Sequence, residues 1–190
     1  MAANKIILGI DPGTNILGYG VIELIGSQIV MKDVGILHMK AELDGHEKLK
    51  LIHNKISALI KELHPQAMAI EAPFYGKNVQ SMLKLGRAQG VAIAAAVQQD
   101  LPVFEYSPKK IKQSITGNGN ASKAQVSAMI CRLLNLKDVP AFFDETDALA
   151  TSLCHILQGA KIEKAKGSTN KKANSWSAFV KENPLKIKKN

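Results

Sequence analysis

The sequence has little of what several common protein classes need. Its 190 residues include only two cysteines, Cys131 and Cys154. Both lie in apolar, helix-like stretches, which favours two buried small side chains in a reducing compartment over a disulfide. No apolar run approaches the ~20 residues of a membrane-spanning helix. The N-terminal letters MAANKIILGID enter a predicted strand at once and show no cleavable signal pattern, so we expect a cytoplasmic protein.

Several sequence motifs are also missing. There is no CxxC and no HExxH, which argues against a zinc site. There is no GxxxxGK[ST] phosphate-binding loop and no GxGxxG dinucleotide motif. The chain therefore lacks the usual signals of zinc enzymes, P-loop NTPases and dinucleotide-binding oxidoreductases.

Positive charge is present in excess but unevenly placed. The formal net charge is +9, and residues 161–190 hold nine lysines against two glutamates. Residues 1–160 are nearly neutral overall, with a net charge of +2. The excess predicts an anionic partner, and the composition after residue 159 predicts a basic, disordered tail over residues 160–190 that follows a domain of residues 1–159.

Hydrophobic periodicity predicts a mixed α/β domain. Runs of strand type, separated by turn residues, predict strands at 5–10, 17–24, 28–39, 67–70 and 102–106. Helical spacing predicts helices at 46–63, 78–99, 108–115, 122–134 and 144–157. Three strands in succession favour an antiparallel meander, and the later alternation adds parallel strands with helices on both faces of a five-stranded sheet.

Four acidic residues stand where this sheet would place a binding site. Asp11 ends the first predicted strand and Glu71 ends the fourth, and ligands bind beyond strand ends in sheets of this kind. Asp144 and Asp147 are three residues apart, on one face of the last predicted helix at its first turn. Each acid alone could be a helix cap or a surface charge. Together they favour a site for Mg²⁺ or Mn²⁺, because hard cations prefer oxygen ligands, and four carboxylates can hold two ions.

The same sequence resembles the RuvC family of Holliday-junction resolvases. ILGIDPGTNILGYGVIE is similar to the first two strands of that family, AIEAPFYGKNVQSMLKLGRAQG and the residues after it to its middle, and DETDALATSLCH to its last helix. The similarity covers about residues 4–158. It implies an RNase H-like fold, a homodimer, Mg²⁺ dependence, and symmetric nicking of two opposing strands at a four-way DNA junction.

The resemblance also implies roles for single residues. It assigns the catalytic, metal-binding acids to Asp11, Glu71, Asp144 and Asp147, although some family members have histidine in place of Asp144. Contacts to DNA are implied for a loop aromatic and for lysines near the cleaved strand, which are Phe74, Lys112 and Lys123. Lys123 is also expected among the catalytic residues. Tyr75 and Lys77, in the same loop as Phe74, are weaker candidates for DNA contact. The helix from Asn78 resembles the dimer contact, and the RuvA–RuvB branch-migration complex is an implied partner.

The residues themselves support part of this assignment. Phe74 lies between Pro73 and Gly76, so a loop position is favoured and an aromatic there can stack on an unpaired base. Lys123 falls in the first turn of its predicted helix, an unfavourable place for a cation unless an anion is bound nearby.

Three other functions stay open at this point. A strand followed by DPGT also occurs in actin-like ATPases and sugar kinases, but those chains are longer and repeat the motif. A junction-binding module without nuclease activity would have little use for four clustered acids, which repel DNA unless a cation intervenes. A nuclease of the same superfamily could act on RNA–DNA hybrids or single strands, and only a comparison of substrates separates that function from junction cleavage.

Overall fold

The computed structural model describes residues 4–73 and 78–167, and along 160–167 it describes the backbone alone. The chain divides into two units, Met1–Leu157 and Gln158–Asn190. The fold described below is that of the first unit. Within the described ranges, no helix combines the length and apolar character needed to cross a membrane.

A five-stranded mixed sheet forms the centre of the first unit. The strands are β1 (Lys5–Asp11), β2 (Ile16–Ile25), β3 (Gln28–His38), β4 (Ala67–Glu71) and β5 (Val103–Tyr106), in the spatial order β3-β2-β1-β4-β5. Strands β1 to β3 pair antiparallel, whereas β4 pairs parallel with β1, and β5 parallel with β4. The predicted meander with parallel additions is confirmed.

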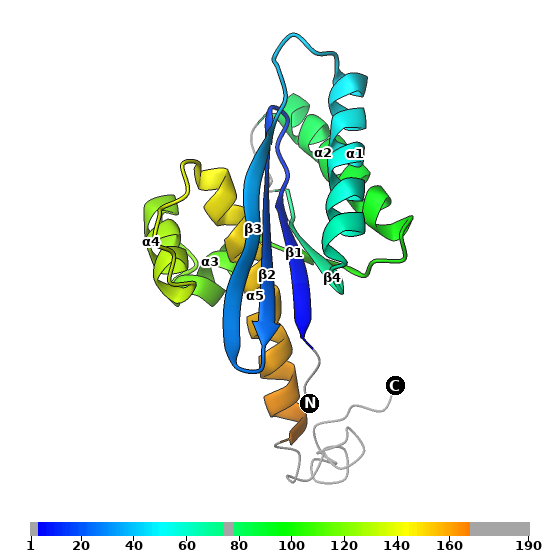
Figure 1. Cartoon of the computed structure of the whole chain (residues 1–190). Helices are drawn as coiled ribbons and strands as arrows, with labels where there is room; N and C mark the ends of the chain where they lie inside the picture. The colour runs from blue at the N-terminus through cyan, green and yellow to red at the C-terminus, as the bar shows by residue number, and fades with distance from the viewer. Residues whose placement is uncertain (1–3, 74–77, 168–190) are drawn as a thin grey trace, which may run out of the picture. The chain divides into compact units, whose positions relative to one another are not determined.

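In the described part of the chain, five helices cover the sheet: α1 (Gly45–Leu63), α2 (Val79–Val97), α3 (Pro108–Thr116), α4 (Lys123–Leu133) and α5 (Phe143–Gly167). In Figure 1, α1 and α2 lie on one face of the sheet, and α3, α4 and α5 lie on the other. The prediction of helices on both faces is confirmed.

Strand alternation divides the buried side chains into two cores. On β1 and β4, Leu8, Ile10, Met68 and Ile70 pack with α1 and α2. Their neighbours in sequence point to the opposite face, where Ile7 and Ala69 join the side chains of α3, α4 and α5, including the fully buried Cys154. Each helix layer is therefore fixed to the sheet by its own hydrophobic cluster.

Local capping explains where two of the helices begin. Asp44 accepts hydrogen bonds from the backbone N–H groups of His46 and Glu47, while the Glu47 carboxylate accepts from the Asp44 N–H. Ser122 and Gln125 form the same reciprocal capping box at the start of α4. Both boxes satisfy N–H groups that the first helical turn leaves without partners.

The last helix is longer than predicted. The sequence places its end at about Leu157, and the structure continues it to Gly167. Residues 160–166 are alanine, lysine, glutamate and one isoleucine, most of which favour the helix. A lysine-rich composition does not by itself end a helix. The boundary between a domain of residues 1–159 and a tail of residues 160–190 stays a prediction.

Candidate active site

Asp11 and Glu71 lie side by side at the ends of two adjacent parallel strands. Ile10 of β1 pairs with Ile70 of β4, so the next residue of each strand is one of the two acids. Side chains alternate along a strand, and Gly9 and Ala69, two residues earlier, face α5. Both carboxylates therefore project from neighbouring strand ends on the face of the sheet that α5 covers.

Three glycines allow α5 to approach this face closely. A Cβ on Gly9 would lie 2.2 Å from the Ala148 carbonyl oxygen, and one on Gly18 would lie 2.1 Å from the Asp144 carbonyl oxygen. A Cβ on Gly20 would lie 2.7 Å from the Leu149 amide nitrogen. The helix backbone thus rests directly on β1 and β2, which brings Asp144 and Asp147 to the strand-end acids.

The first turn of α5 is capped by Glu145, which is not one of the four candidate site acids. The Glu145 carboxylate accepts a hydrogen bond from the Phe142 N–H at 3.0 Å, and the Thr146 hydroxyl donates to the Phe143 carbonyl at 3.0 Å. Glu145 thus supplies the capping interaction that the sequence could also have assigned to Asp144. Asp144 is half-buried, and its negative charge contributes to the electrostatics of Asp11.

Two lysines balance part of the negative charge. The Lys123 ammonium donates to a carboxylate oxygen of Asp147 at 2.6 Å, where the Asp147 side chain is 14% exposed and that of Lys123 is 57% exposed. Lys112 of α3 lies close enough to Glu71 for its charge to lower the pKa of that carboxyl. The sequence places Lys123 in the first turn of α4, and the structure supplies Asp147 as the anion expected there.

Burial and mutual repulsion raise the pKa values of the strand-end acids. The pKa of Asp11 lies well above its ordinary value because burial disfavours the charged form, and because Glu71, Asp147 and Asp144 add negative charge. Lys123 opposes this rise. Burial, followed by the charge of Asp147, raises the pKa of Glu71 from 4.5 to about 7 against the opposing charges of Lys123 and Lys112.

Lys123 shows the complementary effect. Burial lowers the pKa of its ammonium, but the hydrogen bond to Asp147 and the charges of the surrounding acids outweigh that effect, so the pKa is raised. Lys123 therefore stays charged under all ordinary conditions.

The donor set has the chemistry that a hard divalent cation requires. Four carboxylates from β1, β4 and α5 provide oxygen ligands only, and a cation among them would relieve the repulsion that raises the pKa of Asp11. Across residues 4–73 and 78–167, no group of three His, Cys, Asp or Glu side chains is close enough together to hold a metal ion. This agrees with the repulsion among the acids and with the engagement of Asp147 by Lys123.

The other sequence-predicted site residues divide into two groups. Lys112 and Lys123 lie within electrostatic reach of the acids. Phe74, Tyr75 and Lys77 lie outside the described residues, so their proximity to the acids stays a prediction. The sequence reasoning did not identify Gly9, Gly18 and Gly20 as positioning residues, although glycines at alternate positions of β-strands are a recognised sign of close backbone approach.

Comparison with known proteins places this arrangement in a family. The family model described as "Crossover junction endodeoxyribonuclease RuvC" matches residues 7–155.

The chain belongs to the RuvC family.

Relatives of the same name confirm the assignment over nearly the whole chain. The protein of Cytophaga hutchinsonii is 53% identical over 185 residues, which cover 97% of this chain and 89% of that protein. The protein of Bacteroides fragilis is 49% identical over 186 residues, covering 97% and 96%.

The structure agrees with solved RuvC structures. Thermus thermophilus RuvC in complex with a Holliday junction substrate is 29% identical, with a TM-score of 0.78, and the match covers 83% of this chain and 96% of that chain. The RNase H-like fold is thereby confirmed. Membership of the RuvC family makes the chain an endonuclease and implies dependence on a divalent metal ion.

Proposed function

We infer that this chain is a crossover junction endodeoxyribonuclease, which resolves Holliday junctions in homologous recombination and DNA repair. The observation that carries this function is the convergence of Asp11, Glu71, Asp144 and Asp147 on one face of the RuvC-type sheet. A solved RuvC of the same fold has been captured with a Holliday junction substrate. Four-way junction DNA is therefore the substrate that we assign to this chain.

The four acids are the ligands that we propose for two Mg²⁺ ions, for which Mn²⁺ could substitute. When bound, such ions supply charge stabilisation to a phosphodiester and lower the pKa of a bound water. Asp11 is the central candidate, because it lies between Glu71 on β4 and the two acids of α5, and all three affect its pKa. Hydrolysis with water as the nucleophile would leave 5′-phosphate and 3′-hydroxyl ends.

Lys123 has a specific part in this proposal. Its ammonium is fixed by Asp147 beside the acids and stays charged, so it can donate to a non-bridging phosphate oxygen of the cleaved strand. Because the Lys123 side chain is 57% exposed, a phosphate can reach it without displacing the protein core. Lys112, which acts on Glu71, would contact the same strand. Phe74, Tyr75 and Lys77 stay proposed DNA contacts.

An exposed stripe along α2 supports the proposed homodimer. Val79 is 65% exposed and Leu83 is 54% exposed, and a Cβ on the exposed Gly86 or Gly90 would meet nothing within 4 Å. Their spacing of four, three and four residues places them on one helix face, where a second copy of α2 can pack closely. Two copies would present two active sites and so nick two opposing strands symmetrically.

Two further assignments rest on family membership alone. The RuvA–RuvB branch-migration complex is the proposed protein partner, since it works with the resolvase in this family. The cytoplasm is the proposed location, because the relatives come from bacteria and their chromosomal DNA lies in that compartment.

The deciding experiment compares substrates under one set of conditions. The purified protein is incubated with a synthetic four-way junction, a linear duplex of the same sequence and an RNA–DNA hybrid, each with Mg²⁺ and with EDTA. We expect paired nicks at symmetric positions of the junction, only with Mg²⁺, and intact duplex and hybrid.

The other outcomes have distinct meanings. Cleavage of the hybrid in preference to the junction would retain the acidic site and reassign the substrate. Tight junction binding without cleavage in either Mg²⁺ or Mn²⁺ would contradict the nuclease assignment and favour a binding module. ATP hydrolysis without DNA would move the chain to another enzyme class.

A further inference from the structure

We propose that a basic pocket, formed by the turn between β1 and β2 together with α1 and α2, binds a phosphate of the DNA strand that enters the active site. The pocket has a volume of about 650 Å³. The inference rests on the proposed function and adds a second, non-cleaving phosphate site to it. Its lining residues are Thr14, Asn15, Ala41, Leu43, Gly45, His46, Lys48, Leu49, Ile52, Lys84, Arg87 and Ala88.

The ionisable side chains that line the pocket are all basic. Lys48 of α1 and Lys84 and Arg87 of α2 line it, with the imidazole of His46 at the start of α1. No carboxylate is among the described residues that line it. Three permanent cations without a lining acid create a strongly positive concavity, which is the electrostatic footprint of a phosphate site.

Of the acids nearest along the chain, Glu42 is exposed and outside the pocket lining, and Asp44 and Glu47 bond to each other and to the first turn of α1. Asp44 accepts from two backbone N–H groups of α1, and Glu47 reaches back to the Asp44 N–H. Their charge is therefore held at the cap of α1 and leaves the pocket cations available for a ligand.

Polar groups of the β1–β2 turn complete the pocket. The Lys48 ammonium donates to the Asn15 amide oxygen at 2.8 Å, which holds the half-buried lysine against the turn. The same contact leaves the Asn15 amide N–H₂ as a donor, and the Thr14 hydroxyl lies in the same lining. Neutral donors beside cations are the usual composition of a site for a phosphodiester oxygen.

The position of the pocket links it to the acids. Asn15 is only four residues after Asp11, so the two Cα atoms are at most about 14 Å apart. A stacked nucleic acid strand advances about 3.4 Å per nucleotide, and that separation corresponds to roughly four nucleotides or fewer. A strand that crosses the carboxyl end of β1 can thus place one phosphate at the acids and another in the pocket.

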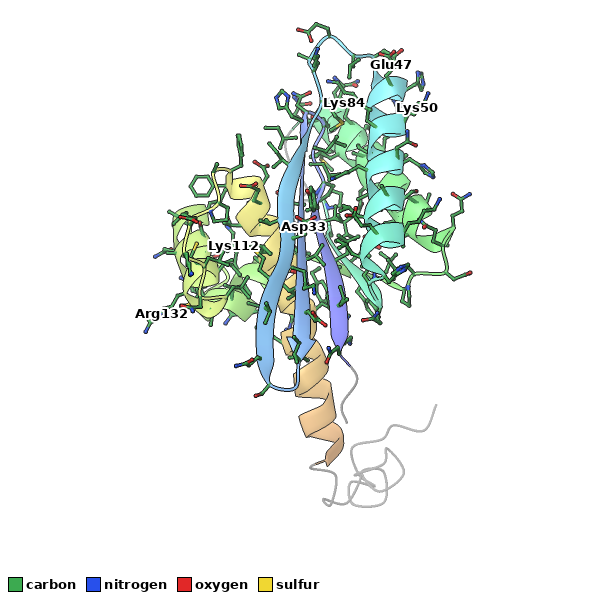
Figure 2. All side chains as sticks on the ribbon, in the orientation of Figure 1. Asp33, Glu47, Lys50, Lys84, Lys112 and Arg132 are labelled. Carbon is green, nitrogen blue, oxygen red and sulfur yellow. The ribbon has the colours of Figure 1, made fainter. Side chains whose placement is uncertain are left out.

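The pocket is distinct from the proposed dimer contact. Lys84 and Arg87 each follow a member of the α2 stripe, Leu83 and Gly86, by one position, and one residue turns the helix by about 100°. In Figure 2, Lys84 lies on the side of α1 that faces the sheet, whereas Lys50 points away on the outer side of that helix. Lys50 therefore provides a control charge on the same helix layer.

The first test compares two double variants with equal loss of charge. Lys84→Ala/Arg87→Ala removes two pocket cations, and Lys50→Ala/Lys61→Ala removes two exposed lysines of α1 that do not line the pocket. Junction affinity is measured by fluorescence anisotropy in EDTA over a range of NaCl concentrations. We expect the pocket variant to bind more weakly and to show a salt slope reduced by about 1 for each phosphate that is no longer neutralised, with the control close to wild type.

The second test locates the phosphate. Neutral methylphosphonate linkages are introduced singly at each of the four positions on either side of the cleaved phosphodiester. Wild type and the control variant should lose affinity at one of these positions, and Lys84→Ala/Arg87→Ala should be insensitive there. Circular dichroism and size-exclusion chromatography of both variants establish that fold and assembly are retained.

The outcomes separate this proposal from the proposed function. If the protein binds and cleaves junctions but the two double variants behave alike, the pocket assignment is wrong and the nuclease stands. The same conclusion follows if the pocket variant stays as sensitive as wild type at every neutralised position. If wild type shows no preference for a junction over a duplex, the proposed function itself fails.

Discussion

Asp11 combines three properties that rarely occur together in one carboxyl group. It is half-buried, it ends a strand whose preceding residues are in the core, and it is surrounded by acids that raise its pKa. A protein keeps such an electrostatically unfavourable group when the group has a function.

Asp11→Asn should abolish cleavage and preserve junction binding. The amide retains the shape of the side chain but loses the negative charge, and we expect a loss of at least about 10²-fold in cleavage rate. Junction affinity in EDTA should be equal or higher, because a charge that repels DNA has been removed. Asp33→Asn on the edge strand β3 is the matched control and should cleave normally (Figure 2). An active Asp11→Asn protein would remove Asp11 from the site.

Glu71 makes the stability of the metal-free protein depend on pH. Its pKa is about 7 in the fold against an ordinary 4.5, so the folded state binds the proton more tightly than the unfolded state. The associated stability is complete below about pH 4.5 and is lost as the pH rises through about 7. The shift corresponds to at most about 3.4 kcal/mol.

Glu71→Gln should therefore stabilise the protein at high pH and reduce this dependence. Urea unfolding in EDTA at pH 5 and pH 8 measures it. Wild type should lose stability between the two values, Glu71→Gln should lose less and exceed wild type at pH 8, and the exposed Glu62→Gln should resemble wild type. Equal stabilities of wild type and Glu71→Gln at pH 8 would contradict the raised pKa.

For single residues, the sequence predicts where a side chain lies on its strand or helix better than it predicts which other residue it contacts. The ends of two predicted strands and a helical i, i+3 spacing pointed to the four acids, because both signals are local. The ion pair of Lys123 with Asp147 joins residues 24 positions apart and depends on how α4 and α5 pack. The pocket cations Lys48, Lys84 and Arg87 likewise come together only through the packing of α1 on α2.

Helix α5 is the element that assembles the site. Its backbone rests on Gly9, Gly18 and Gly20, so the separation of the helix acids from the strand acids is set by backbone contact. Binary patterning foresaw the helix and its acidic first turn. It did not predict that Gly9, Gly18 and Gly20 form the contact surface for α5, which we call the glycine seat. Glycine in a strand also indicates weak or irregular pairing. It also misplaced the end of α5, since composition was used where propensity was the better guide.

Gly9→Ala should damage both stability and cleavage. The added methyl group would meet the backbone of α5, which cannot move aside as a flexible side chain can, and overpacking of this kind costs about 1–3 kcal/mol. A shift of α5 by even 1 Å would misplace Asp144 and Asp147, which can lower the rate about 10²-fold. Thermal unfolding and junction cleavage at a temperature where the variant is folded measure the two effects.

Gly159→Ala provides the control on the same helix. A Cβ there meets nothing within 4 Å, so cleavage should stay near wild type, and the unfolding temperature should be equal or slightly higher because alanine favours a helix over glycine. If Gly9→Ala is folded and cleaves at the wild-type rate, the close seat of α5 does not control the geometry of the acids.

The molecule as a whole separates its tasks between the two faces of the sheet. The face under α5 carries the acids, and the α1–α2 layer carries both the basic pocket and the exposed stripe of α2. The antiparallel meander, the parallel additions and the two helix layers follow from the sequence pattern. The proposed dimer contact does not follow from the sequence pattern. Exposed apolar residues indicate a contact surface only when the structure shows which of them share one helix face.

Leu83→Glu should convert a dimer into a monomer. A charge in the centre of the α2 stripe would be buried against its symmetry equivalent, and such desolvation is costly. Light scattering coupled to size-exclusion chromatography should give a dimeric mass for wild type and a monomeric mass for the variant. Leu133→Glu alters a leucine of α4 that is 49% exposed and should stay dimeric. A dimeric Leu83→Glu protein would place the contact elsewhere.

The glycine seat of α5 also limits which substitutions the protein can tolerate. Large core residues such as Ile7 or Leu149 can exchange with others of similar volume, because neighbouring side chains can repack. Gly9, Gly18 and Gly20 have no such freedom, since each faces helix backbone and no smaller or equal residue exists. In a saturation library selected for junction cleavage, these three positions should therefore accept almost no substitution, and the hydrophobic positions around them should accept many.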